Sequence, residues 1–89
     1  MDEYLKNLLN DVINELSEKV NKHPNDNTYN LILKQIEFIQ DCLVNKKNIF
    51  AELNGRELNF NVVASKNLSG PETELQKRIS EIAVYLSEL

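Results

Sequence analysis

The sequence predicts an all-α fold: a small single-domain helical bundle of four to five helices built on an antiparallel helical hairpin. Three observations lead to this prediction. The chain has 89 residues, the size of one domain. Apolar residues recur at the spacing of helices that bury one face. The two longest such stretches are joined by a short polar turn, which predicts that the two helices pack as antiparallel neighbours. We therefore expect residues 1–89 to form a single helical domain.

The first helix is expected over residues 2–22. Asp2 and Glu3 suit its start, because the helix dipole favours negative charge there. Pro24 disfavours helical geometry at the preceding His23, and the Asn/Asp cluster that follows prefers turns, so the helix ends at this point. One face of the helix carries the apolar residues Leu5, Leu9, Val12, Leu16 and Val20.

The second and most apolar helix is expected over residues 28–45, at the centre of the bundle. Its buried stripe, with 4-3-4 spacing, is Ile32, Ile36, Ile39 and Leu43. Asp26, Asn27 or Thr28 can each cap its first turn, since each has a side-chain oxygen for an unpaired backbone N–H. Lys46 and Lys47 follow its end, where the dipole favours cations.

Residues 47–53 are expected to form a short third helix that uses Ile49, Phe50 and Leu53 and is closed by a left-handed cap at Asn54-Gly55. The segment 57–68 is ambiguous, because Leu58 to Val62 alternates apolar and polar residues as a strand does. A lone strand would have no partner for its backbone groups. We therefore expect a fourth helix with its apolar residues inward: Phe60, Val63, Ala64 and Leu68.

The last helix begins at Ser69-Gly70-Pro71-Glu72, where Ser69 and Glu72 have capping-box spacing and Pro71 fits the first turn. Its stripe is Leu75, Ile79, Ile82, Leu86 and Leu89. The stripes of all the helices together predict a core, which consists of Leu9, Val12, Leu16, Ile32, Ile36, Ile39, Leu43, Val63, Leu75, Ile79, Ile82 and Leu86.

Charge and composition narrow the choice of partner. The net charge of -4 and the pI near 4.9 argue against binding nucleic acid or an anionic membrane surface, and favour a basic or amphoteric protein. No apolar run approaches the roughly 20 residues that span a bilayer. The single cysteine, Cys42, has no partner for an internal disulfide, and no signal peptide is evident. We therefore expect a cytoplasmic protein.

The sequence offers no convincing catalytic, cofactor or metal site, so the protein is not expected to be an enzyme. His23 has no second ligand at metal-binding spacing, and an acidic neighbour of Cys42 opposes thiolate formation. Glu37 and Asp41 share a helix face, which could serve acid–base chemistry or a divalent ion, but a solvated acidic face is the simpler interpretation.

Three stretches, in order, resemble the small helical immunity proteins that neutralise NAD(P)-hydrolysing effectors of type VI and related secretion systems. The first is Val12-Ile13-x-x-Leu16 with His23-Pro24 after it. The second is Leu33-Lys34-Gln35-Ile36-Glu37-Phe38-Ile39, followed by Leu43. The third is Leu58 to Leu68, with Val63-Ala64-Ser65-Lys66 inside it, then a Pro-Glu start, Leu75 and Tyr85.

The resemblance implies a cytoplasmic inhibitor, monomeric on its own, that binds its cognate secreted toxin and occludes the active site without catalysis. Exposed acids would then meet a cationic dinucleotide pocket, and the predicted partner-binding residues are Asp26, Glu37, Asp41, Glu52 and Glu57. The alternative is a self-associating helical adaptor or structural module without a toxin partner, because the stripe of the last helix could seat a partner helix. A DNA-linked antitoxin is disfavoured by the negative charge.

Overall fold

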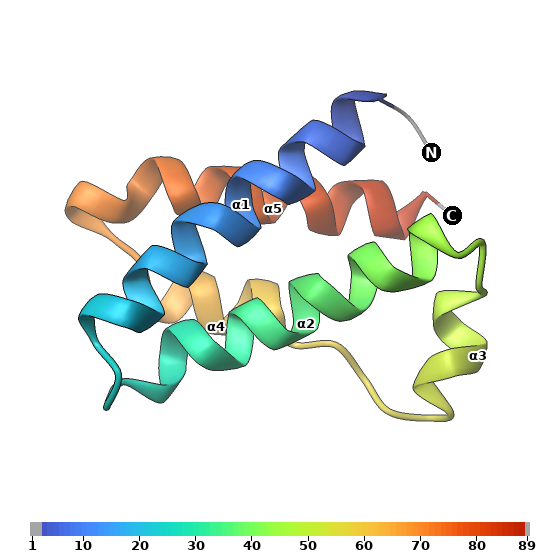
Figure 1. The fold of residues 1–89 in the computed structure, drawn as a ribbon, viewed down its shortest axis with the longest axis horizontal. Helices are drawn as coiled ribbons and strands as arrows, with labels where there is room; N and C mark the ends of the chain where they lie inside the picture. Colours follow the sequence, from blue (N-terminus) through green and yellow to red (C-terminus); the bar gives the residue numbers. More distant parts are fainter. Residues whose placement is uncertain (1–2, 89) are drawn as a thin grey trace.

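The computed structural model describes residues 3–88, which contain helices and no strand (Figure 1). The elements are α1 (Glu3–Lys22), α2 (Asn27–Val44), α3 (Ile49–Leu53), α4 (Phe60–Asn67), the 3-10 turn η1 (Gly70–Glu72) and α5 (Thr73–Ser87). The predicted all-α fold is confirmed. The positions of Asp2 and Leu89, which we had assigned to the terminal helices, lie outside the described residues.

Helices α1 and α2 form the expected hairpin, and the other elements pack around it (Figure 1). Helix α5 contacts α1, α4 lies between α2 and α5, and the short α3 contacts α2. The bundle measures 32 × 27 × 21 Å. Helix α2 therefore contacts α1, α3 and α4, which makes it the central element, as its apolar sequence predicts.

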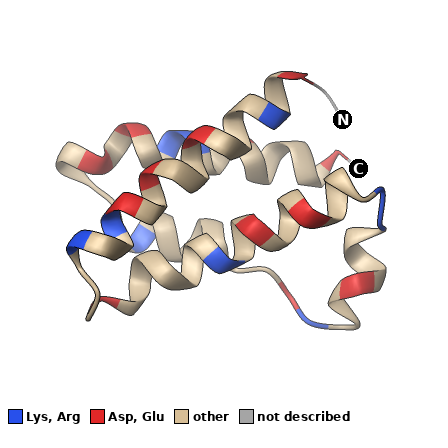
Figure 2. Cartoon of the chain, viewed as in Figure 1, with Lys and Arg blue, Asp and Glu red and all other residues tan. Residues whose placement is uncertain are grey.

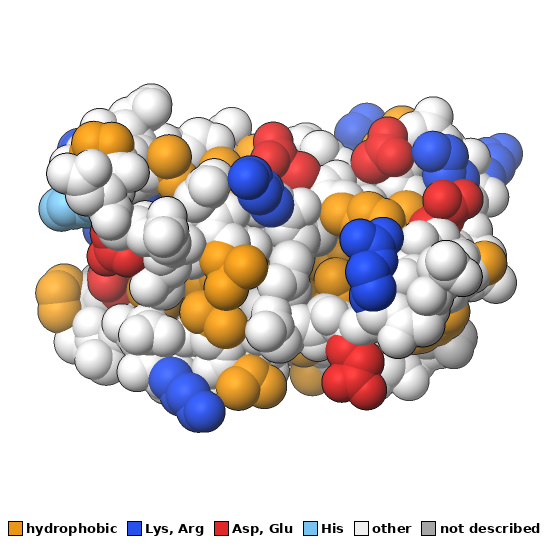
Figure 3. Space-filling view, turned by 90° about the horizontal axis from the view of Figure 1, so that it is seen from below, with side chains coloured by type: hydrophobic (Ala, Val, Ile, Leu, Met, Phe, Trp, Pro, Cys, Tyr) orange, Lys and Arg blue, Asp and Glu red, His pale blue; other side chains and the backbone are white. Residues whose placement is uncertain are grey.

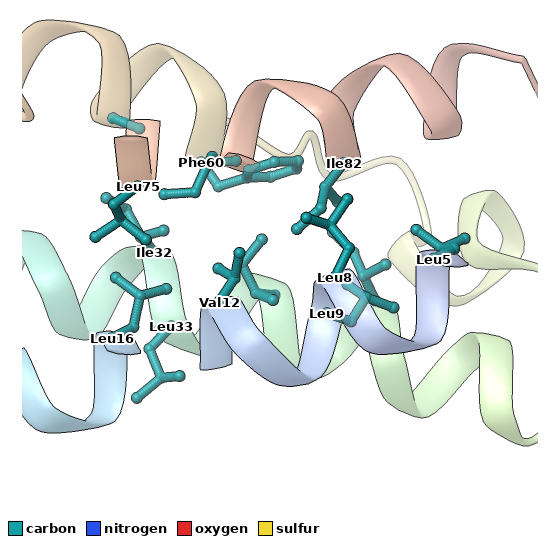
Figure 4. Packing of buried hydrophobic residues seen from close by; sticks show 14 of the residues in the cluster. Leu5, Leu8, Leu9, Val12, Leu16, Ile32, Leu33, Phe60, Leu75 and Ile82 are labelled. Carbon is teal, nitrogen blue, oxygen red and sulfur yellow. The ribbon is translucent and has the colours of Figure 1, made fainter. Parts of the chain in front are cut away.

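One hydrophobic core joins all five helices. Figure 4 shows Leu16, Ile32 and Leu75, from three different helices, gathered at one end of this core, and Leu8 and Ile82 facing each other further along it. None of the polar or charged residues within 3–88 is buried. The core is thus wholly apolar, and the hydrophobic effect is what holds the helices together.

Three residues of the predicted core, Leu43, Val63 and Leu86, are only half-buried and pack against its edge. In α2 the buried line passes through Cys42, which is 1% exposed, so the neighbouring Leu43 turns away from the core centre. Phe50, which we expected α3 to bury, is 59% exposed. With only five residues, α3 has room for two buried side chains, and these are Ile49 and Leu53.

The helix ends follow the sequence signals closely. Of the three candidate caps for α2, Asp26 is the one used, and its carboxylate accepts a hydrogen bond from the Thr28 backbone N–H at 2.9 Å. Asn54 and Gly55 end α3 in left-handed conformations, with φ of 51° and 85°. The predicted left-handed cap is therefore confirmed.

The segment 57–68 is helical, as predicted, but only from Phe60 onward. Residues 57–59 are non-helical because their end is tied to α2 by a pair of hydrogen bonds. The Asn59 backbone N–H donates to Gln35 Oε1 at 2.9 Å, and Gln35 Nε2 donates to Asn59 Oδ1 at 2.6 Å. We call this pair of residues the amide clamp.

The expected capping box at the start of α5 does not form. Ser69 makes no side-chain cap bond, and the chain enters α5 through η1, with Pro71 in that turn. Glu72 is engaged elsewhere, because its carboxylate accepts a hydrogen bond from the Tyr29 hydroxyl at 2.8 Å and pairs with Lys19 Nζ at 3.3 Å. Contacts with α1 and α2 thus replace the local cap.

Candidate partner-binding surface

Glu37 and Asp41 of α2 are both exposed and are spaced one helical turn apart. Figure 2 shows acidic segments on the second half of this helix. The inner face of the same helix buries Ile32, Ile36 and Ile39, each with 0% exposure. The helical period of α2 therefore places the apolar residues on the buried face and the two carboxylates on the exposed face. The two carboxylates project from a helix that the core holds in place.

Asp41 is the centre of a small polar network at the end of α2. Its carboxylate accepts a hydrogen bond from Asn45 Nδ2 at 2.8 Å and forms an ion pair with Lys47 Nζ at 3.4 Å. Both partners of the ion pair are well exposed, and such pairs contribute at most about 1 kcal/mol. A partner's cation could therefore displace Lys47 at small cost.

Glu52, on α3, lies in the electrostatic neighbourhood of Cys42. Burial raises the pKa of the Cys42 thiol, and the carboxylates of Glu52 and Asp41 raise that pKa further, while Lys47 lowers it. Both carboxylates act on one thiol, so these two predicted residues of different helices each lie within electrostatic reach of Cys42. Sequence spacing alone could not show this.

Asp26 and Glu57 lie apart from that group. Asp26 caps the opposite end of α2, and at 1.5 Å per residue it is about 22 Å along the helix from Asp41. Its carboxylate is already bonded to the Thr28 N–H. Glu57 is exposed in the loop after α3, beside Arg56, at the edge of a groove.

This groove, of about 290 Å³, runs between α2 and the 53–58 segment. Its lining is Leu31, Lys34, Gln35, Phe38, Leu53, Arg56, Glu57 and Leu58. On the face seen in Figure 3, hydrophobic side chains lie among basic and acidic ones. Sequence reasoning missed the groove, although one signal pointed to it: Leu31 is apolar, lies outside the stripe of α2 and is 44% exposed.

The residues with catalytic side-chain chemistry are engaged in packing. Cys42 is 1% exposed, with a raised thiol pKa, and the His23 ring stacks on Tyr29 with ring centroids 5.7 Å apart. Within residues 3–88, no three His, Cys, Asp or Glu side chains are grouped so that they could hold a metal ion. Nor does any helix in the described part have the length and apolar character to cross a membrane.

Exposed carboxylates on a fixed helix and an open mixed groove offer surfaces on which a protein partner could bind. Comparison with known proteins makes this interpretation specific. The model of the Tsi6 family matches residues 4–88, and the chain belongs to this family of type VI secretion immunity proteins. Membership implies that the partner is a toxin protein. No curated protein and no solved structure matches the chain significantly.

Proposed function

We propose that this protein binds a secreted NAD(P)-degrading toxin in the cytoplasm and blocks its active site, so that the cell producing the toxin is not poisoned. Membership of the Tsi6 family supports the toxin partner, and the order of motifs described above supports the NAD(P)-degrading class. Inhibition would be by occupancy, with the immunity protein as a monomer placed over the substrate pocket.

The observation that carries the proposal is the pair of exposed carboxylates, Glu37 and Asp41, one turn apart on α2. A pocket that holds the phosphates of a dinucleotide is cationic, so an acidic surface complements it and also speeds the encounter. The helix that bears Glu37 and Asp41 is fixed by its buried face, which lowers the entropy lost on binding.

The size of the surface also fits. A standard interface buries roughly 800 Å² on each partner, which extends well beyond two side chains. Such an area, centred between Glu37 and Asp41, extends beyond α2, and we propose that it takes in Glu52 and Glu57. Asp26 is about 20 Å from that centre along the helix axis and would contact only a larger partner surface. The groove beside Glu57 could then receive an apolar side chain of the toxin.

The double change Glu37→Lys with Asp41→Lys tests this proposal. We expect circular dichroism and the melting temperature to stay close to wild type, because both side chains are exposed. Association with the cognate toxin domain should slow by about tenfold or more at low salt, since electrostatic steering raises association rates by about 10–10³-fold. Inhibition of NAD(P) consumption by the toxin should be lost.

A matched control reverses two exposed acids of α1, Asp11→Lys with Glu18→Lys. Each substitution in either variant replaces one negative charge with one positive charge, so the two variants have the same net charge. If the control loses inhibition to the same extent, net charge and not the α2 surface governs binding. A folded α2 variant that still inhibits at the wild-type rate would place the interface elsewhere.

The self-associating alternative has one observation in its favour. A second groove, between α3, α4 and the end of α5, has no charged residue in its lining, and Phe50 and Val62 at its edge are 59% and 54% exposed. Sedimentation separates the two functions. A particle near 10.3 kDa at micromolar concentration supports the monomeric inhibitor, and a stable dimer supports the adaptor.

A further inference from the structure

The first turn of α1 and the last turns of α5 form a notch of about 360 Å³ that neither the core nor the α2 surface uses. Its lining is Tyr4, Glu81, Val84, Tyr85 and Glu88, and we call it the terminal notch. The start of α1 and the end of α5 lie toward the same end of the bundle (Figure 1).

The apolar wall of the terminal notch consists of Tyr4, Val84 and Tyr85, and side-chain contacts hold it in place. Tyr4 is 54% exposed and Val84 57% exposed, so neither side chain serves mainly to fill the core. The Tyr4 hydroxyl donates a hydrogen bond to Glu81 Oε2 at 2.6 Å, and the rings of Tyr4 and Tyr85 lie 6.1 Å apart with an interplanar angle of 38°. The hydrogen bond joins residues 77 positions apart, and together the two contacts fix the notch before any partner arrives.

The charge in the terminal notch has one sign. Glu81 and Glu88 are both acidic, and within residues 3–88 no lysine or arginine belongs to the lining. An occupant that contacts both the carboxylates and the apolar wall would combine a cation with an apolar stem. The stem would lie against Val84 and the rings, and the cation would reach the carboxylates.

Of the two common cationic side chains, arginine fits better. Its planar guanidinium stacks on aromatic rings and binds a carboxylate through two parallel N–H groups, whereas a lysine ammonium is a compact, strongly hydrated charge. We propose that the terminal notch receives an arginine side chain presented by a partner protein. This site is separate from the α2 surface and does not depend on which reaction the partner catalyses.

The test uses the full-length protein and a small probe, N-acetyl-arginine N-methylamide, followed by amide chemical shifts in NMR. We expect shifts at Tyr4 and at residues 81–88. The citrulline analogue has nearly the same shape without the charge, and the lysine analogue has the charge without the planar group. Both analogues should bind more weakly than the arginine probe.

The variant Glu81→Gln should weaken arginine binding about three- to fivefold, the factor for losing one exposed ion pair, while its amide oxygen can still accept the Tyr4 hydrogen bond. The control Glu74→Gln makes the same charge change on the same helix, outside the notch, and should bind as wild type does. The amide spectrum of each variant reports its fold. The proposal is wrong if the citrulline analogue causes the same shifts as the arginine probe, or if the lysine analogue binds as tightly. It is also wrong if both variants weaken arginine binding equally, or if the shifts are centred on α2.

Discussion

Replacing Ile36 by alanine should destabilise the protein more than any comparable change on the surface of α2. Ile36 has 0% exposure at the middle of the central helix. The change removes three carbon atoms, worth about 2.4 kcal/mol at roughly 0.8 kcal/mol each. The cavity left behind raises the expected cost to about 3–4 kcal/mol. A domain of 89 residues has a total stability of about 4–13 kcal/mol, so the loss is a large fraction of it.

Urea denaturation followed by circular dichroism measures this loss through the midpoint and slope. In thermal unfolding, a loss of about 3 kcal/mol should lower the melting temperature by about 12–24 °C. Leu31→Ala is the matched control, because it removes the same number of carbons from the same helix at a residue that is 44% exposed. It should cost about 1 kcal/mol or less. Equal losses for the two variants, or an unchanged midpoint for Ile36→Ala, would refute the assignment of the core.

Two further predictions concern single hydrogen-bonded side chains. The hydrogen bond from Tyr29 to Glu72, aided by burial, raises the pKa of Tyr29 from 10.0 to about 12. The neutral phenol therefore stabilises the folded state below pH 10, and this contribution to stability is lost as the pH rises toward 12. In an ultraviolet titration, Tyr29→Phe should remove a phenol that titrates near pH 12, and an unchanged titration curve would contradict the contact. Gln35→Ala breaks the amide clamp, so it should lower the free energy of unfolding by about 1–2 kcal/mol and speed hydrogen exchange at the Asn59 backbone N–H. Unchanged exchange would mean that other contacts hold the loop.

The elements that sequence predicted best are those whose buried face is long and regular. Helices α1, α2 and α5 repeat apolar residues over four or more turns, so their period determines which side chains enter the core. The mistakes fall on the short helices α3 and α4, at Phe50 and Val63, and on the last turns of α2 and α5, at Leu43 and Leu86. Whether Cys42 or Leu43 completes the stripe of α2, and whether Phe50 is inside, depends on how the helix is rotated against its neighbours, which a sequence pattern does not specify.

Local signals failed where a distant residue competed for the same side chain. Ser69 and Glu72 have the spacing of a capping box, but Tyr29 and Lys19 bind Glu72 instead. The predicted binding acids show the same limit. Sequence placed Glu37 and Asp41 on one face, because helical spacing is enough for that. The positions of Glu52 and Asp26 relative to them depend on how α3 packs and how far α2 extends.

The order in which the helices are synthesised has a consequence for folding in the cell. Helix α5 is made last, yet it supplies Leu75, Ile79 and Ile82, each at most 1% exposed, and its Arg78 pairs with Glu15 of α1. At about 5–20 residues per second, the end of α5 follows the end of α2 by roughly 2–9 s, and until then the part of the core that α5 covers stays open. The nascent hairpin is therefore exposed to chaperones and proteases until α5 has been made.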